Sequence, residues 1–155
     1  MGAENPPILL VDDRRANLAA LEAVFEPEGY DLVCVTSGEE AVDQVERREF
    51  AVVLLDLQMP TMDGVQTARE MRKRAARLGR RVPIIFVTAI DIDRASIPRA
   101  YDAGAVDFLQ KPLETQVLRA KVAVFADLYR SRHLASDHSP DMESEGLCSY
   151  GLFRP

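Results

Sequence analysis

Five polar residues follow short apolar runs of this sequence, at positions where buried strands would end. They are three acids, a threonine and a lysine: Asp12, Asp13, Asp56, Thr88 and Lys111. Three carboxylates held together repel one another, and the usual remedy is a bound cation. Magnesium accepts carboxylate and carbonyl oxygens together with the oxygens of a phosphate group. These residue types therefore predict a magnesium-dependent site that handles a phosphoryl group.

Asp56 is the candidate nucleophile of this site. It follows the run 51–55, which is β-branched, lacks a 3.6-residue period and is typical of a strand covered on both faces. Ligands of open α/β sheets bind at the carboxyl ends of such strands. Lys111 would supply a positive charge and Thr88 a hydroxyl donor for the phosphoryl oxygens, so that Asp56 forms an aspartyl phosphate. Taken alone, Asp56 could also cap a turn.

Apolar runs alternate with longer amphipathic segments, which predicts five strands and five helices. The expected strands are 8–11, 32–35, 51–55, 84–87 and 106–109, and the expected helices are 16–25, 39–48, 65–78, 97–103 and 115–132. Strands joined by helical crossovers pair in parallel and carry helices on both faces. The predicted fold class is α/β, a flavodoxin-like doubly wound sheet with strand order 2-1-3-4-5, which brings the three acids together.

Local signals mark several ends of these elements. Ser37 and Glu40 have the spacing of a capping box. Pro98 is tolerated only in a first turn, so the fourth helix should begin near Ser96. Three glycines stand where helix ends need a left-handed residue: Gly29, Gly79 and Gly104.

The composition predicts one domain at residues 7–132, an N-terminal tail at 1–6 and a disordered polar tail at 133–155. No apolar run is long enough to cross a bilayer, and the N-terminus lacks the pattern of an export signal, so we expect a cytoplasmic protein with no membrane partner. The net charge of −6 argues against a nucleic-acid partner. The run 69–81 holds seven basic residues, which we interpret as a solvated helix face and loop.

Taken together, the motifs closely resemble the receiver domains of two-component response regulators over residues 7–132. The segments that carry the resemblance are Leu10-Val11-Asp12-Asp13, Leu55-Asp56-Leu57-Gln58-Met59-Pro60, Met62-Asp63-Gly64, Thr88-Ala89, Ala103-Gly104-Ala105 and Lys111-Pro112. The resemblance implies a signalling phosphoacceptor rather than an enzyme, because such a domain catalyses only its own phosphorylation and dephosphorylation.

The resemblance also implies roles for individual residues. Asp13, Asp56 and the backbone carbonyl of Gln58 would bind Mg²⁺ directly, whereas Asp12 would act through water. Asp56 would accept its phosphoryl group from a histidine kinase or a histidine phosphotransfer protein. The Lys111–Pro112 peptide bond is expected to be cis, since cis bonds occur essentially before proline.

Phosphorylation is expected to change the surface formed by the fourth helix, fifth strand and fifth helix. Thr88 would move toward the phosphoryl group, and Phe108 resembles the aromatic switch residue of the family. An ordinary core phenylalanine is the alternative interpretation of Phe108. Gln58 and Ile90 occupy positions that could set the phosphate lifetime, with Ile90 shielding the acyl phosphate from water. Surplus apolar residues on the last helix suggest a protein partner, a homodimer or a longer coiled helix.

Two other functions have to be weighed against this prediction. The chain could be a receiver fragment of a larger hybrid histidine kinase or multidomain effector, although the aperiodic tail favours a natural end. It could instead be an aspartate-nucleophile phosphatase of the haloacid dehalogenase type. Such an enzyme needs a second acid two residues after the nucleophile, where this sequence has Gln58. His133 and His138 are expected to be exposed residues of the tail.

Overall fold

The computed structural model describes residues 5–89 and 95–143 and confirms five strands and five α-helices. The strands are β1 (Pro7–Val11), β2 (Asp31–Val35), β3 (Val52–Asp56), β4 (Ile84–Thr88) and β5 (Ala105–Gln110). The helices are α1 (Arg15–Phe25), α2 (Gly38–Arg47), α3 (Gly64–Arg77), α4 (Ser96–Asp102) and α5 (Thr115–Glu143), with a 3₁₀ turn η2 (Glu26–Glu28) after α1.

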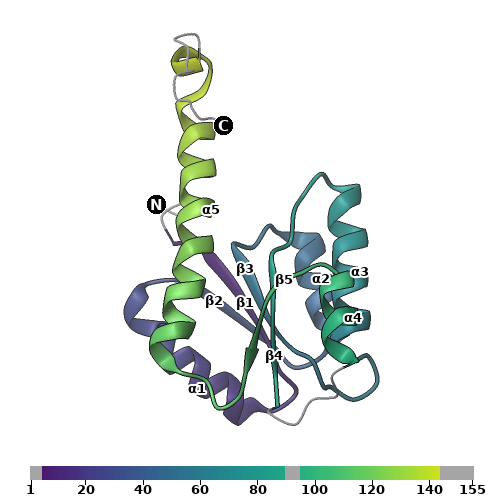
Figure 1. Cartoon of the computed structure of the whole chain (residues 1–155). Helices are drawn as coiled ribbons and strands as arrows, with labels where there is room; N and C mark the ends of the chain where they lie inside the picture. The colour runs from purple at the N-terminus through teal and green to yellow at the C-terminus, as the bar shows by residue number, and fades with distance from the viewer. Residues whose placement is uncertain (1–4, 90–94, 144–155) are drawn as a thin grey trace.

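The strands form one parallel sheet in the predicted order β2-β1-β3-β4-β5. Helices α2, α3 and α4 cover one face of the sheet, and α1 and α5 cover the other (Figure 1). Strands β1 and β3 are neighbours, with Val11 beside Leu55 in the register. The residues at and just after the carboxyl ends of these two strands are therefore adjacent at one edge of the sheet.

The alternation of side chains along the strands divides the core into two layers. In β1, Leu9 and Val11 pack with the α2 and α3 side chains, whereas Ile8 and Leu10 pack with those of α1 and α5. All four side chains are at most 2% exposed. Burial on both faces explains why the strands lack an apolar–polar alternation and read as continuous apolar runs.

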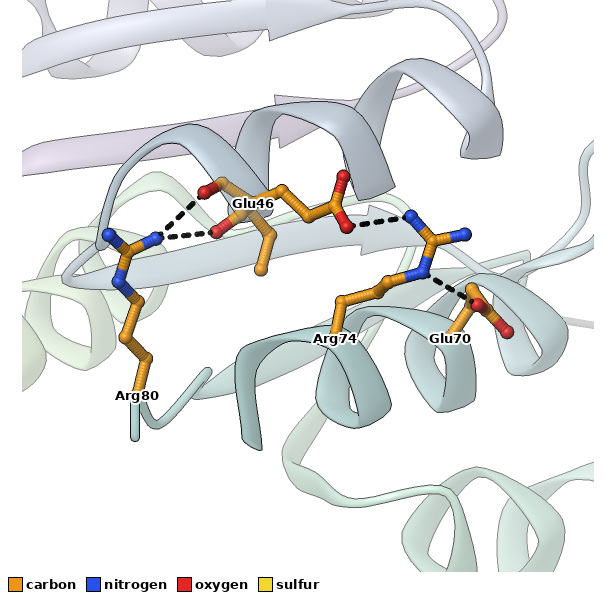
Figure 2. A network of polar contacts seen from close by, with 5 residues as sticks. Glu46, Glu70, Arg74 and Arg80 are labelled. Carbon is orange, nitrogen blue, oxygen red and sulfur yellow. Dashed lines mark hydrogen bonds and ion pairs between the residues drawn. The ribbon is translucent and has the colours of Figure 1, made fainter. Parts of the chain in front are cut away.

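Helices α2 and α3 are joined by charged side chains (Figure 2). Arg74 on α3 contacts the carboxylates of Glu46 on α2 (2.8 Å) and Glu70 on its own helix (3.0 Å). Arg80, just after α3, donates from Nη1 to the carbonyl oxygens of Val45 and Glu46, both at 3.1 Å. Those carbonyls belong to the last turn of α2, where a cation also complements the helix dipole.

The predicted capping box at the start of α2 is only half formed. The Ser37 hydroxyl accepts the N–H of Glu40 at 3.1 Å, but the Glu40 carboxylate accepts the N–H of Thr36 at 2.9 Å instead of closing the box. A complete box occurs at the start of α3, between Asp63 and Gln66. Sequence reasoning overlooked it.

The three expected glycines do adopt positive φ angles: Gly29, Gly79 and Gly104.

Helix α5 corrects the predicted end of the last helix at residue 132 and the disorder predicted from residue 133. It continues through Glu143 and projects beyond the sheet (Figure 1). Each residue with a backbone N–H that extends a formed helix adds one hydrogen bond, so polar residues can continue the helix once packing has started it. His133 is half-buried, and its ring stacks on that of Tyr129 with 3.9 Å between the ring centroids. It is therefore not an exposed tail residue. Residues 144–155 lie outside the described residues.

Pro98 lies in the first turns of α4, which begins at Ser96 as predicted. Within the described part of the chain, no helix combines the length and the apolar character needed to span a membrane.

Candidate functional site

The three acids predicted from strand ends meet at the carboxyl edge of β1 and β3. One carboxylate oxygen from each of Asp12, Asp13 and Asp56 can be chosen so that all three lie within 4.8 Å of one another. Asp12 and Asp56 are buried, and Asp13 is exposed at the mouth of the site. Such a donor set, all oxygen and partly open to water, suits a hard divalent cation.

Asp12 is held in place by the start of α1 and by Lys111. Its Oδ1 accepts the N–H of Arg14 at 2.9 Å, and its Oδ2 accepts the Asn17 side chain at 3.0 Å. The Lys111 ammonium lies 3.7 Å from Oδ2. Sequence reasoning missed Asn17 and the Arg14 N–H, although an acid two residues before a helix-start N–H is a recognisable turn signal.

Asp56 combines burial with a crowded negative environment. Burial, together with the nearby charges of Asp12 and Asp13, raises the pKa of Asp56 to about 6 against the opposing effects of the Gln58 N–H and Lys111. The Gln58 N–H donates to Asp56 Oδ1 at 3.2 Å. The carboxylate is therefore destabilised when ionised, and a cation or a covalent bond at this oxygen would relieve that cost.

The turn that follows β3 fits closely around Asp56. A Cβ atom at Gly64 would lie 2.6 Å from the Asp56 carbonyl oxygen and 2.7 Å from the Leu57 Cα. The Gly64 N–H donates to the Leu57 carbonyl at 2.9 Å. Thr61 takes a positive φ of 69° in the same turn. The first turn of α3 therefore lies directly against the backbone of the strand end that carries Asp56.

Thr88 and Lys111 lie at the ends of the adjacent strands β4 and β5. The Lys111 N–H donates to the Thr88 carbonyl at 2.7 Å, and the Lys111–Pro112 peptide bond is cis, as the resemblance implied. The Thr88 hydroxyl is buried and has no hydrogen-bond partner among the residues that the structure describes. A buried hydroxyl without a partner costs free energy, so a ligand that accepts a hydrogen bond from it would be favoured.

Phe108 occupies a half-buried position on β5. Its ring centroid lies 6.1 Å from that of Phe86 on β4 and 6.1 Å from that of Tyr101 on α4. The Phe108 ring is therefore close both to the buried ring of Phe86 and to the exposed ring of Tyr101. Ile90, the other residue expected to influence the site from this side, lies outside the described residues.

The fold and the acidic site define the class of this protein. Residues 8–123 match the family model of the response regulator receiver domain, so the chain belongs to that family. The family is one of signalling domains in two-component systems and is not an enzyme family.

One relative of known name is a bacterial transcriptional regulatory protein. The chain is 32% identical over 147 residues to the transcriptional regulatory protein ZraR of Escherichia coli K12, with 95% of this chain aligned. The chain spans about 30% of the length of that relative.

Two solved structures share the fold. The signal receiver domain of a Luxo repressor protein from Vibrio parahaemolyticus gives a TM-score of 0.72 at 25% identity, covering 84% of this chain and 97% of that one. The receiver domain of a sensor histidine kinase from Pseudomonas aeruginosa PAO1 gives a TM-score of 0.70 at 31% identity, covering 79% and 98%. In that crystal structure a magnesium ion is coordinated in the active-site cleft.

Proposed function

We propose that Asp56 accepts a phosphoryl group from the phosphohistidine of a histidine kinase or a histidine phosphotransfer protein in the cytoplasm. The observation that carries the proposal is the meeting of Asp12, Asp13 and Asp56 within 4.8 Å at the carboxyl edge of the sheet. No other role accounts as well for a buried acid beside two further acids, because the cluster costs free energy unless a cation and a phosphoryl group use it.

In the proposed transfer, a phosphorus–oxygen bond to Asp56 replaces the phosphorus–nitrogen bond to the donor histidine. An ionised oxygen of Asp56 bonds to phosphorus as the phosphorus–nitrogen bond to the donor imidazole breaks, and the released nitrogen keeps that electron pair. The Lys111 ammonium, 3.7 Å from Asp12, is placed to compensate negative charge on the phosphoryl oxygens. The unpartnered hydroxyl of Thr88 would donate to one of these oxygens.

The acids fit magnesium, and Asp13, Asp56 and the Gln58 carbonyl are proposed as its direct ligands, with Asp12 acting through water. The ion would neutralise phosphoryl oxygens during transfer. Asp12 already receives two hydrogen bonds and the Lys111 charge, which supports an indirect role. The exposed position of Asp13 leaves its carboxylate free to turn toward a cation.

Phosphorylation is proposed to act on partners by shifting an existing equilibrium of the α4–β5–α5 surface. Once the Thr88 hydroxyl is bound to phosphate, the space next to Phe108 changes, and Phe108 and Tyr101 would rearrange together. Tyr101 and Val124 are 47% and 55% exposed, so this surface has apolar area for a partner or a second copy. Because one relative is a transcriptional regulatory protein, the expectation of no nucleic-acid partner stays untested.

A phosphorylation assay tests the proposed function directly. Wild type is incubated with acetyl phosphate and Mg²⁺, and its intact mass is followed over time. We expect wild type to gain one phosphoryl group, Asp56→Asn to gain none, and the surface variant Asp43→Asn to behave as wild type. Equal labelling of wild type and Asp56→Asn would assign the reaction to another residue. Absence of labelling in wild type would contradict the proposal.

A further inference from the structure

A hollow of about 500 Å³ lies at the amino edge of the sheet, away from the acidic site. Its lining comes from the residues that precede β3 and β4, from the end of α3, and from β5 and α5. The apolar lining includes Val106, Phe125 and Leu128. Every charged residue of the lining is an arginine: Arg72, Arg80, Arg81 and Arg132. We refer to this hollow as the arginine groove.

Two of these arginines are fixed by the protein backbone. Arg72 donates to the carbonyl oxygen of Ala103 at 3.1 Å. Arg80 donates through one nitrogen to two carbonyls at the end of α2, leaving the rest of its guanidinium for other acceptors (Figure 2). Side chains held in this way lose little conformational freedom when they bind a partner.

The positive charge of the groove is largely uncompensated. Arg132 contacts the carboxylate of Glu49 at 3.2 Å. Arg81 is exposed and has neither a hydrogen bond nor an ion pair with any described residue. Guanidinium groups pair best with carboxylate or phosphate oxygens, so the groove is complementary to an anion. This local charge is notable on a chain whose net charge is −6, which would repel acidic partners elsewhere.

The groove has the character of a docking surface more than of a small-molecule pocket. Val106 and Leu128 are 47% and 54% exposed, so the apolar floor is open to solvent. Small-molecule sites enclose most of their ligand, whereas protein interfaces combine exposed apolar, aromatic and arginine side chains. We propose that the arginine groove docks a segment of a partner protein in which acidic residues stand beside apolar ones. The proposal goes beyond phosphorylation and does not depend on Asp56.

A peptide titration of the full chain tests this proposal. The probe is a short synthetic peptide in which Glu alternates with Leu and Phe, and binding is followed by amide chemical shifts of the ¹⁵N-labelled protein. We expect saturable shifts around the groove. Arg81→Glu and Leu128→Gln should each weaken binding, the former by about tenfold because it reverses a rim charge. Arg77→Glu is the matched control, since it makes the same charge change at an exposed α3 residue outside the groove lining.

Each alternative occupant predicts a different result. The proposal is overturned if wild type shows no saturable shifts, or if Arg81→Glu and Arg77→Glu weaken binding equally. Binding of tripolyphosphate at the groove, with a peptide affinity insensitive to Leu128→Gln, would indicate a small-anion site instead. A dimer seen by sedimentation and lost in Arg81→Glu would indicate that a second copy of this chain occupies the groove. Unfolding midpoints of all variants confirm that they are folded.

Discussion

At the scale of single residues, the properties of Asp56 depend on burial and charge together. Ionised Asp56 is unfavourable because it is 7% exposed and lies beside Asp12. The same ionised oxygen is the nucleophile in the proposed phosphoryl transfer. Ionised Asp56 therefore lowers the stability of the folded protein, and the ligands that the site is proposed to bind would remove this loss.

Replacing Asp56 with asparagine is expected to stabilise the metal-free protein at neutral pH. The pKa of Asp56 is raised from 3.8 to about 6 by burial, so the folded state binds a proton more tightly than the unfolded state. The ionised form therefore lowers stability above pH 6, and this effect disappears as pH falls from 6 toward 4. With screening at the open mouth of the site, we expect Asp56→Asn to gain about 1–2 kcal/mol at pH 7.5.

Urea unfolding in EDTA, measured from pH 7.5 to pH 4, provides the measurement. Asp43→Asn is the control, because Asp43 is an exposed acid paired with Arg47 on the surface of α2. Its stability difference from wild type should change little over this range. An Asp56→Asn variant that is less stable than wild type at pH 7.5 would show that burial of this charge is compensated in the folded protein.

At the scale of helices and strands, α2 and α3 each begin with a buried glycine, Gly38 and Gly64. A Cβ atom added at either position would contact different neighbours. A Cβ atom at Gly64 would collide with the backbone of Asp56 and Leu57. At Gly38, the nearest atoms are side-chain atoms of Thr67 and Met62, not the backbone of the strand end that carries Asp56. The contact at Gly64 is therefore the one that ties the start of α3 to the position of Asp56.

Gly64→Ala should cost about 2–3 kcal/mol, because the backbone around Asp56 has to shift to make room. It should also slow phosphorylation by acetyl phosphate. Gly38→Ala should also lower stability but leave the phosphorylation rate near that of wild type, because its obstacles are side chains and not the Asp56 backbone. Chemical unfolding and intact-mass kinetics measure the two effects. Equal losses of rate in both variants would mean that the Gly64 contact does not position Asp56.

At the scale of the whole molecule, the acidic site is built from the ends of separate strands. Binding of a ligand at this site would therefore affect the stability of the whole fold. The acids come from the ends of β1 and β3, and Lys111 follows β5, so their arrangement exists only when the sheet is assembled. A ligand that binds this arrangement and not the unfolded chain must stabilise the protein by mass action. Binding of the proposed metal ion would therefore be linked to global unfolding.

Magnesium should raise the thermal unfolding midpoint of wild type, with a stabilisation of about 1–3 kcal/mol when its concentration is well above the dissociation constant. The increase should be smaller at pH 5.5 than at pH 7.5, because protons compete with the cation for Asp56. Asp13→Asn should lose most of the increase, whereas Asp43→Asn should keep it. A magnesium effect that is unchanged in Asp13→Asn would place the cation elsewhere.

Much of this architecture could be predicted from the sequence, because its signals are local. Apolar runs and helical periods identified the five strands and five α-helices that the structure describes, and the residues at the strand ends identified the acidic cluster. The errors occurred where local signals are weak. Polar residues after 132 indicated disorder but continue α5, and an Asp-x-x-Gln pattern was not recognised as the box that starts α3.

The sequence by itself determined which residue types stand at the strand ends and the order in which strands and helices follow one another. Only the tertiary structure decided how close the acids lie, because pairing of β1 with β3 sets that distance and burial sets the pKa of Asp56. The arginine groove has the same origin, since Arg81 and Arg132 meet only when α5 packs across the sheet. Periodicity is a property of neighbours along the chain, whereas desolvation and charge complementarity depend on neighbours in space.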